Sequence, residues 1–243
     1  MRITTAWNVE MQALAENADV MAVVEAAEIP GAFQVIAILI RDYAARDIDR
    51  LTDALDRVGT ILPALLMPQE TDDIEDLVRQ IIEAVRALYL NAKNEADLTL
   101  RRAKVVELTL YRRIAPMYAG EDCLMDCVIY GDVPNPHFKN IENREFDLCA
   151  WDEAELSGEA YECGIWPNLL KHRDCQALVH LLKAVELEYD GDEIWFRIGL
   201  VSFHNHKEMY QRVKYLAGSD TRDQREFDWL HLYGYDNIDD VTR

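Results

Sequence analysis

The cysteines are the residues of this sequence best suited to hold a metal ion. The candidate ligands are Cys123, Cys127, Cys149, Cys163 and Cys175, with His172 nearby. Zinc prefers thiolate and imidazole ligands, and four of them fill its tetrahedral coordination shell. Compact zinc motifs bring their ligands in close pairs, however, and here only Cys123 and Cys127 are close, with three residues between them. Because cysteine also packs in cores as a small hydrophobe, we expect buried thiols and no stoichiometric zinc, with a Cys/His metal centre as the alternative.

A second candidate metal site is the segment His204-Asn205-His206 together with Glu208. In an extended chain alternate residues point to the same side, so two imidazoles and one carboxylate could converge on an ion there. A helical pattern begins at Lys207, which weakens this interpretation because a helix would move the three side chains apart. Histidines at the start of a helix are also common surface residues.

Motifs of the common enzyme classes are missing from the sequence. It has no glycine-rich phosphate loop, no Gly-x-Ser-x-Gly and no His-Glu-x-x-His. Paired carboxylates are abundant, but acid/base catalysis needs two of them in a cleft with separated pKa values, and sequence does not show this. No residue is therefore assigned a catalytic role.

Acidic residues are concentrated between residues 121 and 166. This stretch has twelve acidic and two basic residues, a net charge of −10, which is half of the −20 of the whole chain. Tryptophans among carboxylates suit a surface that binds a basic protein. The residues predicted for this surface are Trp151, Asp152, Glu153, Glu155, Glu159 and Trp166. The alternative is that the aromatic rings belong to the core of this region.

Charge and composition limit what the protein contacts. A net charge of −20 repels nucleic acids and anionic lipids, so we expect no direct binding to either. The longest apolar run near the start, Ala32–Ile40, is far shorter than the about 20 residues that span a bilayer. The start of the chain is too polar for a signal peptide, and an odd number of cysteines cannot all be paired within one chain, so we expect a cytoplasmic protein. The sequence does not indicate the oligomeric state.

Helical periodicity dominates the first half of the chain. The five predicted helices cover residues 6–27, 32–45, 48–62, 74–89 and 98–115. Pro30-Gly31 and Pro63 are expected to interrupt them. Asp72 with Glu75 forms a predicted capping box, and Asn94 is a predicted N-cap. Short connections between helices favour an antiparallel bundle over residues 1–120.

The second half, residues 121–243, is predicted to mix helices and short strands. The predicted strands cover 124–130 and 145–150, and the predicted helices cover 168–184, 207–216 and 219–232. Asp190-Gly191-Asp192 lies between two alternating segments, 185–189 and 193–198, which predicts a β-hairpin. The expected fold class is therefore α+β and predominantly helical, with two regions that could share one core.

These features favour a non-enzymatic cytosolic binding protein. We expect its acidic, aromatic-containing surface to engage a basic protein partner, as an antidote, an inhibitor or a regulator would. One alternative is a metal-dependent enzyme that uses the Cys/His set. Another is a structural subunit of a larger assembly, with the helical bundle as its docking surface.

Overall fold

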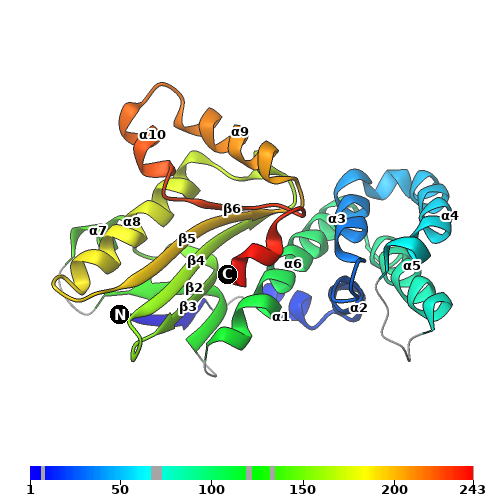
Figure 1. Cartoon of the computed structure of the whole chain (residues 1–243), viewed down its shortest axis with the longest axis horizontal. Coiled ribbons are helices and arrows are strands. Elements are labelled where there is room, and N and C mark those ends of the chain that lie inside the picture. The colour runs from blue at the N-terminus through cyan, green and yellow to red at the C-terminus, as the bar shows by residue number, and fades with distance from the viewer. Residues whose placement is uncertain (7–8, 67–72, 119–121, 132–134, 243) are drawn as a thin grey trace. The chain divides into compact units, whose positions relative to one another are not determined.

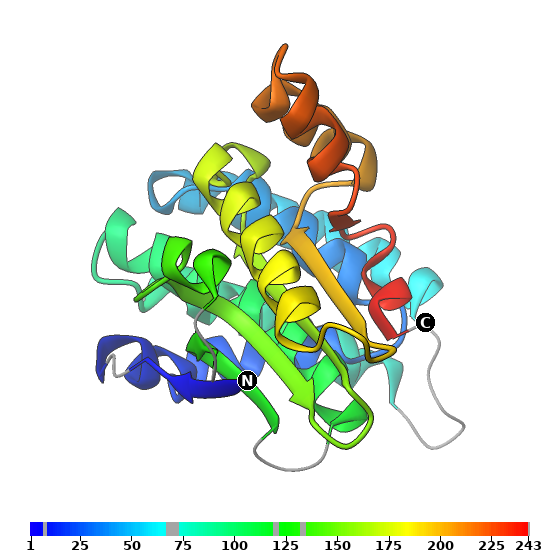
Figure 2. The same cartoon turned by 90° about the vertical axis from the view of Figure 1, so that its left-hand side faces the viewer.

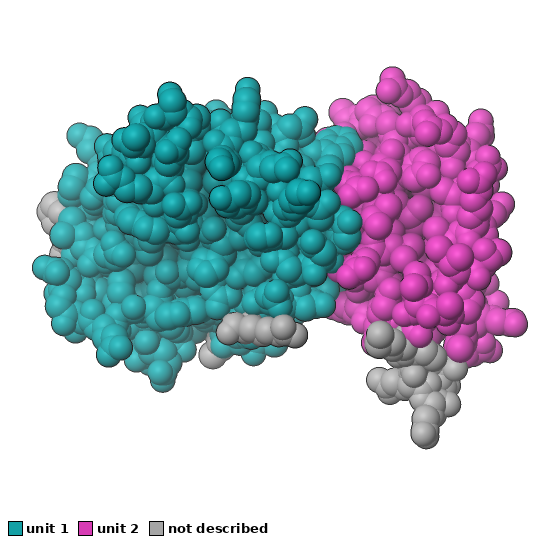
Figure 3. Space-filling model, turned by 45° about the horizontal axis from the view of Figure 1, so that its top comes forward, with its two compact units in different colours: residues 1–8, 110–243 teal, residues 9–109 magenta. Residues whose placement is uncertain are grey.

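The computed structural model describes residues 1–6, 9–66, 73–118, 122–131 and 135–242. It divides into two compact units (Figure 1, Figure 3). One unit is formed by residues 9–109, and the other combines residues 1–8 with 110–243. The sequence predicted a boundary between residues 120 and 121, whereas the structure groups residues 1–8 with residues 110–243.

The unit formed by residues 9–109 is helical. Its helices are α1 (Val9–Ala15), α2 (Ala18–Ala27), α3 (Phe33–Asp42), α4 (Ile48–Leu65), α5 (Ile74–Leu90) and α6 (Glu95–Ile114), whose last five residues belong to the other unit. α5 packs against α2, α3 and α4. Helices in this half of the chain are confirmed, while their antiparallel order stays a prediction.

Two boundaries in this unit differ from those predicted. The expected helix 6–27 is two helices, because the side chain of Asn17 accepts hydrogen bonds from the amides of Asp19 and Val20 and starts α2 anew. Pro63 does not end α4, which continues to Leu65. A proline in the last turn removes only its own donor, and the amide of Leu66 still bonds to the carbonyl of Leu62 at 3.0 Å.

The start of α5 is capped by Asp73, whose side chain accepts from the amides of Glu75 and Asp76. The predicted capping residue Asp72 lies outside the described residues. Asn94 is confirmed as a cap of α6, since its Oδ1 accepts from the amide of Asp97 at 3.0 Å.

The other unit is built on a six-stranded mixed sheet whose strands follow chain order. The strands are β1 (Arg2–Thr5), β2 (Cys123–Tyr130), β3 (Glu145–Asp152), β4 (Ser157–Gly164), β5 (Trp195–Ser202) and β6 (His231–Tyr233). The first four pair antiparallel, and β4–β5 and β5–β6 pair parallel. The strands predicted over 124–130 and 145–150 are confirmed as β2 and β3. The expectation of helix throughout the first 120 residues misses β1.

The predicted hairpin around Gly191 is wrong, although its second segment, 193–198, overlaps β5. Residues 185–188 are the last turn of α8 (His172–Glu188), where Val185 is buried together with Leu178 and Leu181. Gly191 has a φ of 100° in the loop that leads from α8 into β5. β5 then pairs parallel with β4, and such a crossover needs a long connection, which α8 provides.

The last predicted helix is also shorter than expected. Asp220 caps α10 (Thr221–Phe227), and the chain then forms β6. The helix predicted over 207–216 is confirmed as α9 (His206–Ala217), followed by Gly218 at a φ of 58°.

One hydrophobic core lies between this sheet and its helices. α8 runs across the sheet beside α7 (Pro136–Asn140), and α9 and α10 pack next to it (Figure 2). Sheet residues such as Phe146 and Leu200 meet Leu181 of α8 and Phe227 of α10 in this core. No helix of the described residues is long and apolar enough to cross a membrane.

Candidate protein-binding surface

Trp151 of the predicted acidic surface is buried, with 5% of its area exposed. Its ring lies 5.2 Å from that of Tyr189 and 6.0 Å from that of Phe196. The indole Nε1 donates to Oε2 of Glu153 at 2.5 Å. Trp151 therefore packs in the interior next to the turn formed by residues 152–155 and cannot contact a partner. This corrects the prediction that Trp151 is part of the binding surface.

Glu159 is fully buried. In β4 its neighbour Ala160 belongs to the core under α8, so by strand alternation Glu159 points to the opposite face of the sheet. There its carboxylate accepts hydrogen bonds from the hydroxyls of Tyr118 and Tyr161. Burial raises the pKa of Glu159, although these two donors and Arg197 oppose the rise. Glu159 is thus not part of an exposed acidic surface.

Trp166 is half-buried and follows the far end of β4. The turn that carries Asp152, Glu153 and Glu155 precedes Ser157, the first residue of that strand. The full length of β4 therefore separates Trp166 from these carboxylates, and the structure does not bring them together.

Two acidic loops meet at one end of the sheet. The parallel pairing of β4 and β5 places Ser157 opposite Trp195, and the amide of Trp195 donates to the carbonyl of Leu156 at 3.0 Å. The turn after β3 and the loop after α8 therefore lie side by side. We call their carboxylates the acidic rim: Asp152, Glu153, Glu155, Asp190, Asp192 and Glu193. Asp152 is half-exposed and the other five are exposed.

Two members of the acidic rim hold its shape. Oδ1 of Asp152 accepts from the amides of Ala154 and Glu155 at 2.9 and 3.1 Å. Glu153 accepts from the hydroxyl of Tyr189 at 2.9 Å, which fastens the turn to the end of α8. Within the part of the chain that the structure describes, no cation forms an ion pair with the other four carboxylates.

Trp195 lies within the acidic rim and is 50% exposed. The guanidinium of Arg197 lies 4.6 Å from its ring centroid. Arg197 is itself held by the carbonyl of Val241 at 2.6 Å and the hydroxyl of Tyr233 at 3.2 Å. Sequence reasoning missed Trp195 and residues 190–193 because it assigned them to a hairpin. The signal was three acidic residues within the five positions that precede Trp195.

The cysteines are free, and all except the half-buried Cys163 are buried. Burial raises the pKa values of Cys123 and Cys175 to about 12, which disfavours the thiolate that binds metal. No three or more His, Cys, Asp or Glu side chains of the described residues are grouped so that they could hold a metal ion. Zinc binding by the cysteines stays untested.

The histidine segment is only partly extended. His204 Nδ1 bonds to the carboxylate of Glu208, whereas α9 begins at His206. The amide of His206 donates to Asp236 at 2.7 Å. His204 and Glu208 therefore meet, but the three side chains predicted to converge do not form one group.

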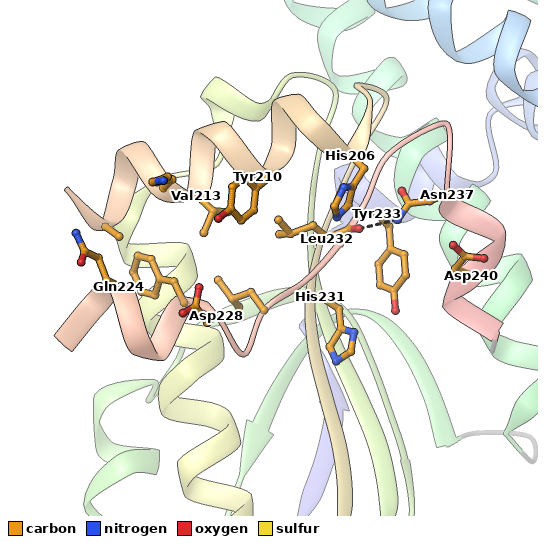
Figure 4. Close-up of a pocket in the computed structure, with 14 residues that line it drawn as sticks. His206, Tyr210, Val213, Gln224, Asp228, His231, Leu232, Tyr233, Asn237 and Asp240 are labelled. Atoms are coloured by element: carbon orange, nitrogen blue, oxygen red, sulfur yellow. Dashed lines mark hydrogen bonds between the residues drawn. The ribbon is translucent and has the colours of Figure 1, made fainter. Parts of the chain in front are cut away.

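A groove of about 710 Å³ lies between α9, α10 and β6 (Figure 4). Val213, Phe227 and Leu230 are buried in its floor, and Lys214 and Asp228 are exposed at its edge. Asn237 Nδ2 donates to the carbonyl of Leu232 at 3.0 Å and so covers part of the outer edge of β6. Because its lining includes both a cation and carboxylates, the groove has a character different from that of the acidic rim.

Neither a protein family model nor a curated protein matches this chain. Its function is therefore inferred from the geometry of its surfaces.

Proposed function

We propose that the protein is a non-enzymatic cytosolic binding protein whose acidic rim engages a basic protein partner, as an antidote, an inhibitor or a regulator would. The observation that carries this proposal is the meeting of two acidic loops at the end of the sheet where the half-exposed Trp195 begins β5. Either loop alone would be an ordinary solvated turn. Together they offer six carboxylates and an aromatic anchor in one place.

The chemistry of the acidic rim supports this proposal. Closely spaced carboxylates raise the local concentration of a cationic partner and steer its approach, and salt screens this effect. An exposed tryptophan supplies the apolar contact on which affinity often depends. Asp152, Glu153 and Tyr189 hold the rim in shape, so binding would order few additional side chains.

The test removes charge from the acidic rim without disturbing its hydrogen bonds. The variant combines Glu155→Gln, Asp190→Asn, Asp192→Asn and Glu193→Gln, and leaves Asp152 and Glu153 intact. A partner is first captured from native lysate at low salt, purified, and its association rate measured by stopped flow. We expect the association rate to fall by about tenfold or more at low salt, and the difference to disappear at high salt.

A matched control carries the same change in net charge on the helical unit. It combines Asp49→Asn, Asp53→Asn, Glu75→Gln and Glu83→Gln, all of which are exposed. This control should associate at nearly the wild-type rate. Equal rates for the rim variant and the wild type, or equal losses in both variants, would reject the acidic rim as the binding surface.

A further inference from the structure

Two histidines that lie far apart in sequence face each other on α7 and α8. The Nδ1 atoms of His137 and His180 are 3.5 Å apart. Their ring centroids are 5.7 Å apart, and the ring planes meet at 31°. The amide nitrogen of Asn140 lies 3.4 Å from the same Nδ1 of His180. The side chains of His137 and Asn140 thus both approach the same nitrogen of His180.

Asn135 fixes this arrangement. Its Oδ1 accepts from the amide of His137 at 3.0 Å and so starts α7. Its Nδ2 donates to the carbonyl of Ala184 in α8 at 2.8 Å. Asn135 is 7% exposed, so both bonds are shielded from water. These two bonds fix the position of the short helix α7 on α8. The two imidazoles are therefore preorganised relative to each other.

The separation of the two nitrogens matches a shared metal ion better than a direct hydrogen bond. Hydrogen bonds from N–H groups are usually about 2.7–3.2 Å long. A tetrahedral zinc ion with bonds of about 2.0–2.1 Å to nitrogen places two of its ligands about 3.3–3.4 Å apart. We propose that His137 and His180 bind a divalent transition-metal ion such as Zn²⁺ through their Nδ1 atoms.

The surroundings keep His180 able to act as a ligand. Burial is the main cause that lowers its pKa, and His137, Lys183 and Arg222 lower it further, while Glu226 acts in the opposite sense. Lys183 and Arg222 both pair with Glu226, at 2.6 and 2.9 Å, which offsets part of their repulsion of an incoming cation. At neutral pH the imidazole therefore keeps the lone pair that a metal ion requires.

The remaining ligands would come from water and from Asn140. Rotating the Asn140 amide by half a turn would bring its oxygen to the position now held by its nitrogen, at a ligand-to-ligand separation that also suits a tetrahedral ion. Two protein imidazoles define an exchangeable site, in contrast to the four-ligand sites that structural zinc occupies. This site uses none of the cysteines and is separate from the acidic rim.

The experiment is a zinc titration of the full chain by calorimetry, after chelator treatment and with a non-thiol reductant. We expect one Zn²⁺ per chain. His137→Gln and His180→Gln should each lower the affinity at least tenfold, because changes even to outer-sphere partners of a metal cost about 10–100-fold. His231→Gln, at an exposed position of β6, is the matched control and should bind as the wild type does.

Cobalt separates this site from the thiols. Co²⁺ bound by the histidines gives no sulfur-to-metal charge-transfer band, whereas Co²⁺ bound by cysteine does. In the wild-type protein, Co²⁺ should also broaden the ring resonances of His137 and His180, which tests the site without any substitution. Absence of binding, a charge-transfer band, or unchanged affinity in both histidine variants would overturn the proposal.

Discussion

The hydroxyl of Tyr118 donates a 3.0 Å hydrogen bond to Oε1 of Glu159, a carboxylate with no exposed surface. Tyr161 donates to the other oxygen of the same group. These bonds stabilise the ionised form, as does Arg197, yet burial outweighs them and raises the pKa of Glu159. Glu159, which was predicted to lie on the binding surface, is thus a buried residue of β4. Its protonation is therefore coupled to folding.

This coupling predicts how stability changes with pH. Because the folded protein favours protonated Glu159, the stabilising contribution is complete below the ordinary pKa of 4.5 and is lost as pH rises through the raised value. Glu159→Gln, which cannot ionise, should lack this loss. Urea unfolding at several pH values above 4.5 should therefore show the variant gaining stability relative to the wild type as pH rises.

Glu155→Gln is the matched control, since it makes the same substitution at an exposed position of the preceding turn. Its stability relative to the wild type should stay nearly constant over the same pH range. A Glu159→Gln difference that is constant with pH, or that shrinks as pH rises, would show that burial does not govern this carboxyl.

Arg144 is predicted to be essential for stability because it pairs with two buried carboxylates. Its Nη2 donates to Glu162 at 2.9 Å and to Asp174 at 2.6 Å, and both acids are 8% exposed. Arg144→Ala should lower the free energy of unfolding by about 3 kcal/mol, because two buried acids lose their cation. Adding Glu162→Gln to Arg144→Ala should recover part of the loss.

Arg79→Ala is the comparison for Arg144, since Arg79 pairs with Asp76 but is 64% exposed. Its cost should stay below about 1 kcal/mol, as is typical of exposed ion pairs. Equal effects of the two arginine substitutions in denaturant melts would contradict the assignment of Arg144 to a buried network.

Ile81 tests the phase of α5. It is fully buried, as is Val85, whereas Leu77, which was predicted to share their buried stripe, is only half-buried. Ile81→Ala should lower the free energy of unfolding by about 2–4 kcal/mol through lost burial and a remaining cavity. Ile74→Ala makes the same change where the side chain is 36% exposed and should cost clearly less. Similar costs at both positions would contradict the helix phase.

Local patterns predicted most of the helices and two of the strands. Apolar spacing indicated α4, α5 and α9, and the predicted cap Asn94 lies next to α6, so its effect is readable in the sequence. The hairpin around Gly191 was wrong because a turn signal does not specify whether the preceding residues are paired with a neighbour or wound into a helix. Val185 belongs to a helix because it is buried beside Leu181, and that contact is set by packing.

The candidate sites depended on tertiary structure more than the individual helices and strands did. The sequence showed where acidic residues are dense, but not that Glu159 and Trp151 are buried, since one residue of register decides the face of a strand. It could not join residues 152–155 to residues 190–193, because the parallel pairing of β4 and β5 brings them together across α8. The facing histidines on α7 and α8 are 43 residues apart and form no motif.

The sequence by itself determined the composition of this protein: its net charge of −20, its amphipathic helices and the acidic character of residues 121–166. These properties depend on residue type and on contacts within a few positions of the chain. Only the tertiary structure decided which carboxylates reach solvent, which are buried with tyrosines, and which histidines meet. Those outcomes depend on strand order and helix packing, which are settled by the burial of apolar surface over the whole unit.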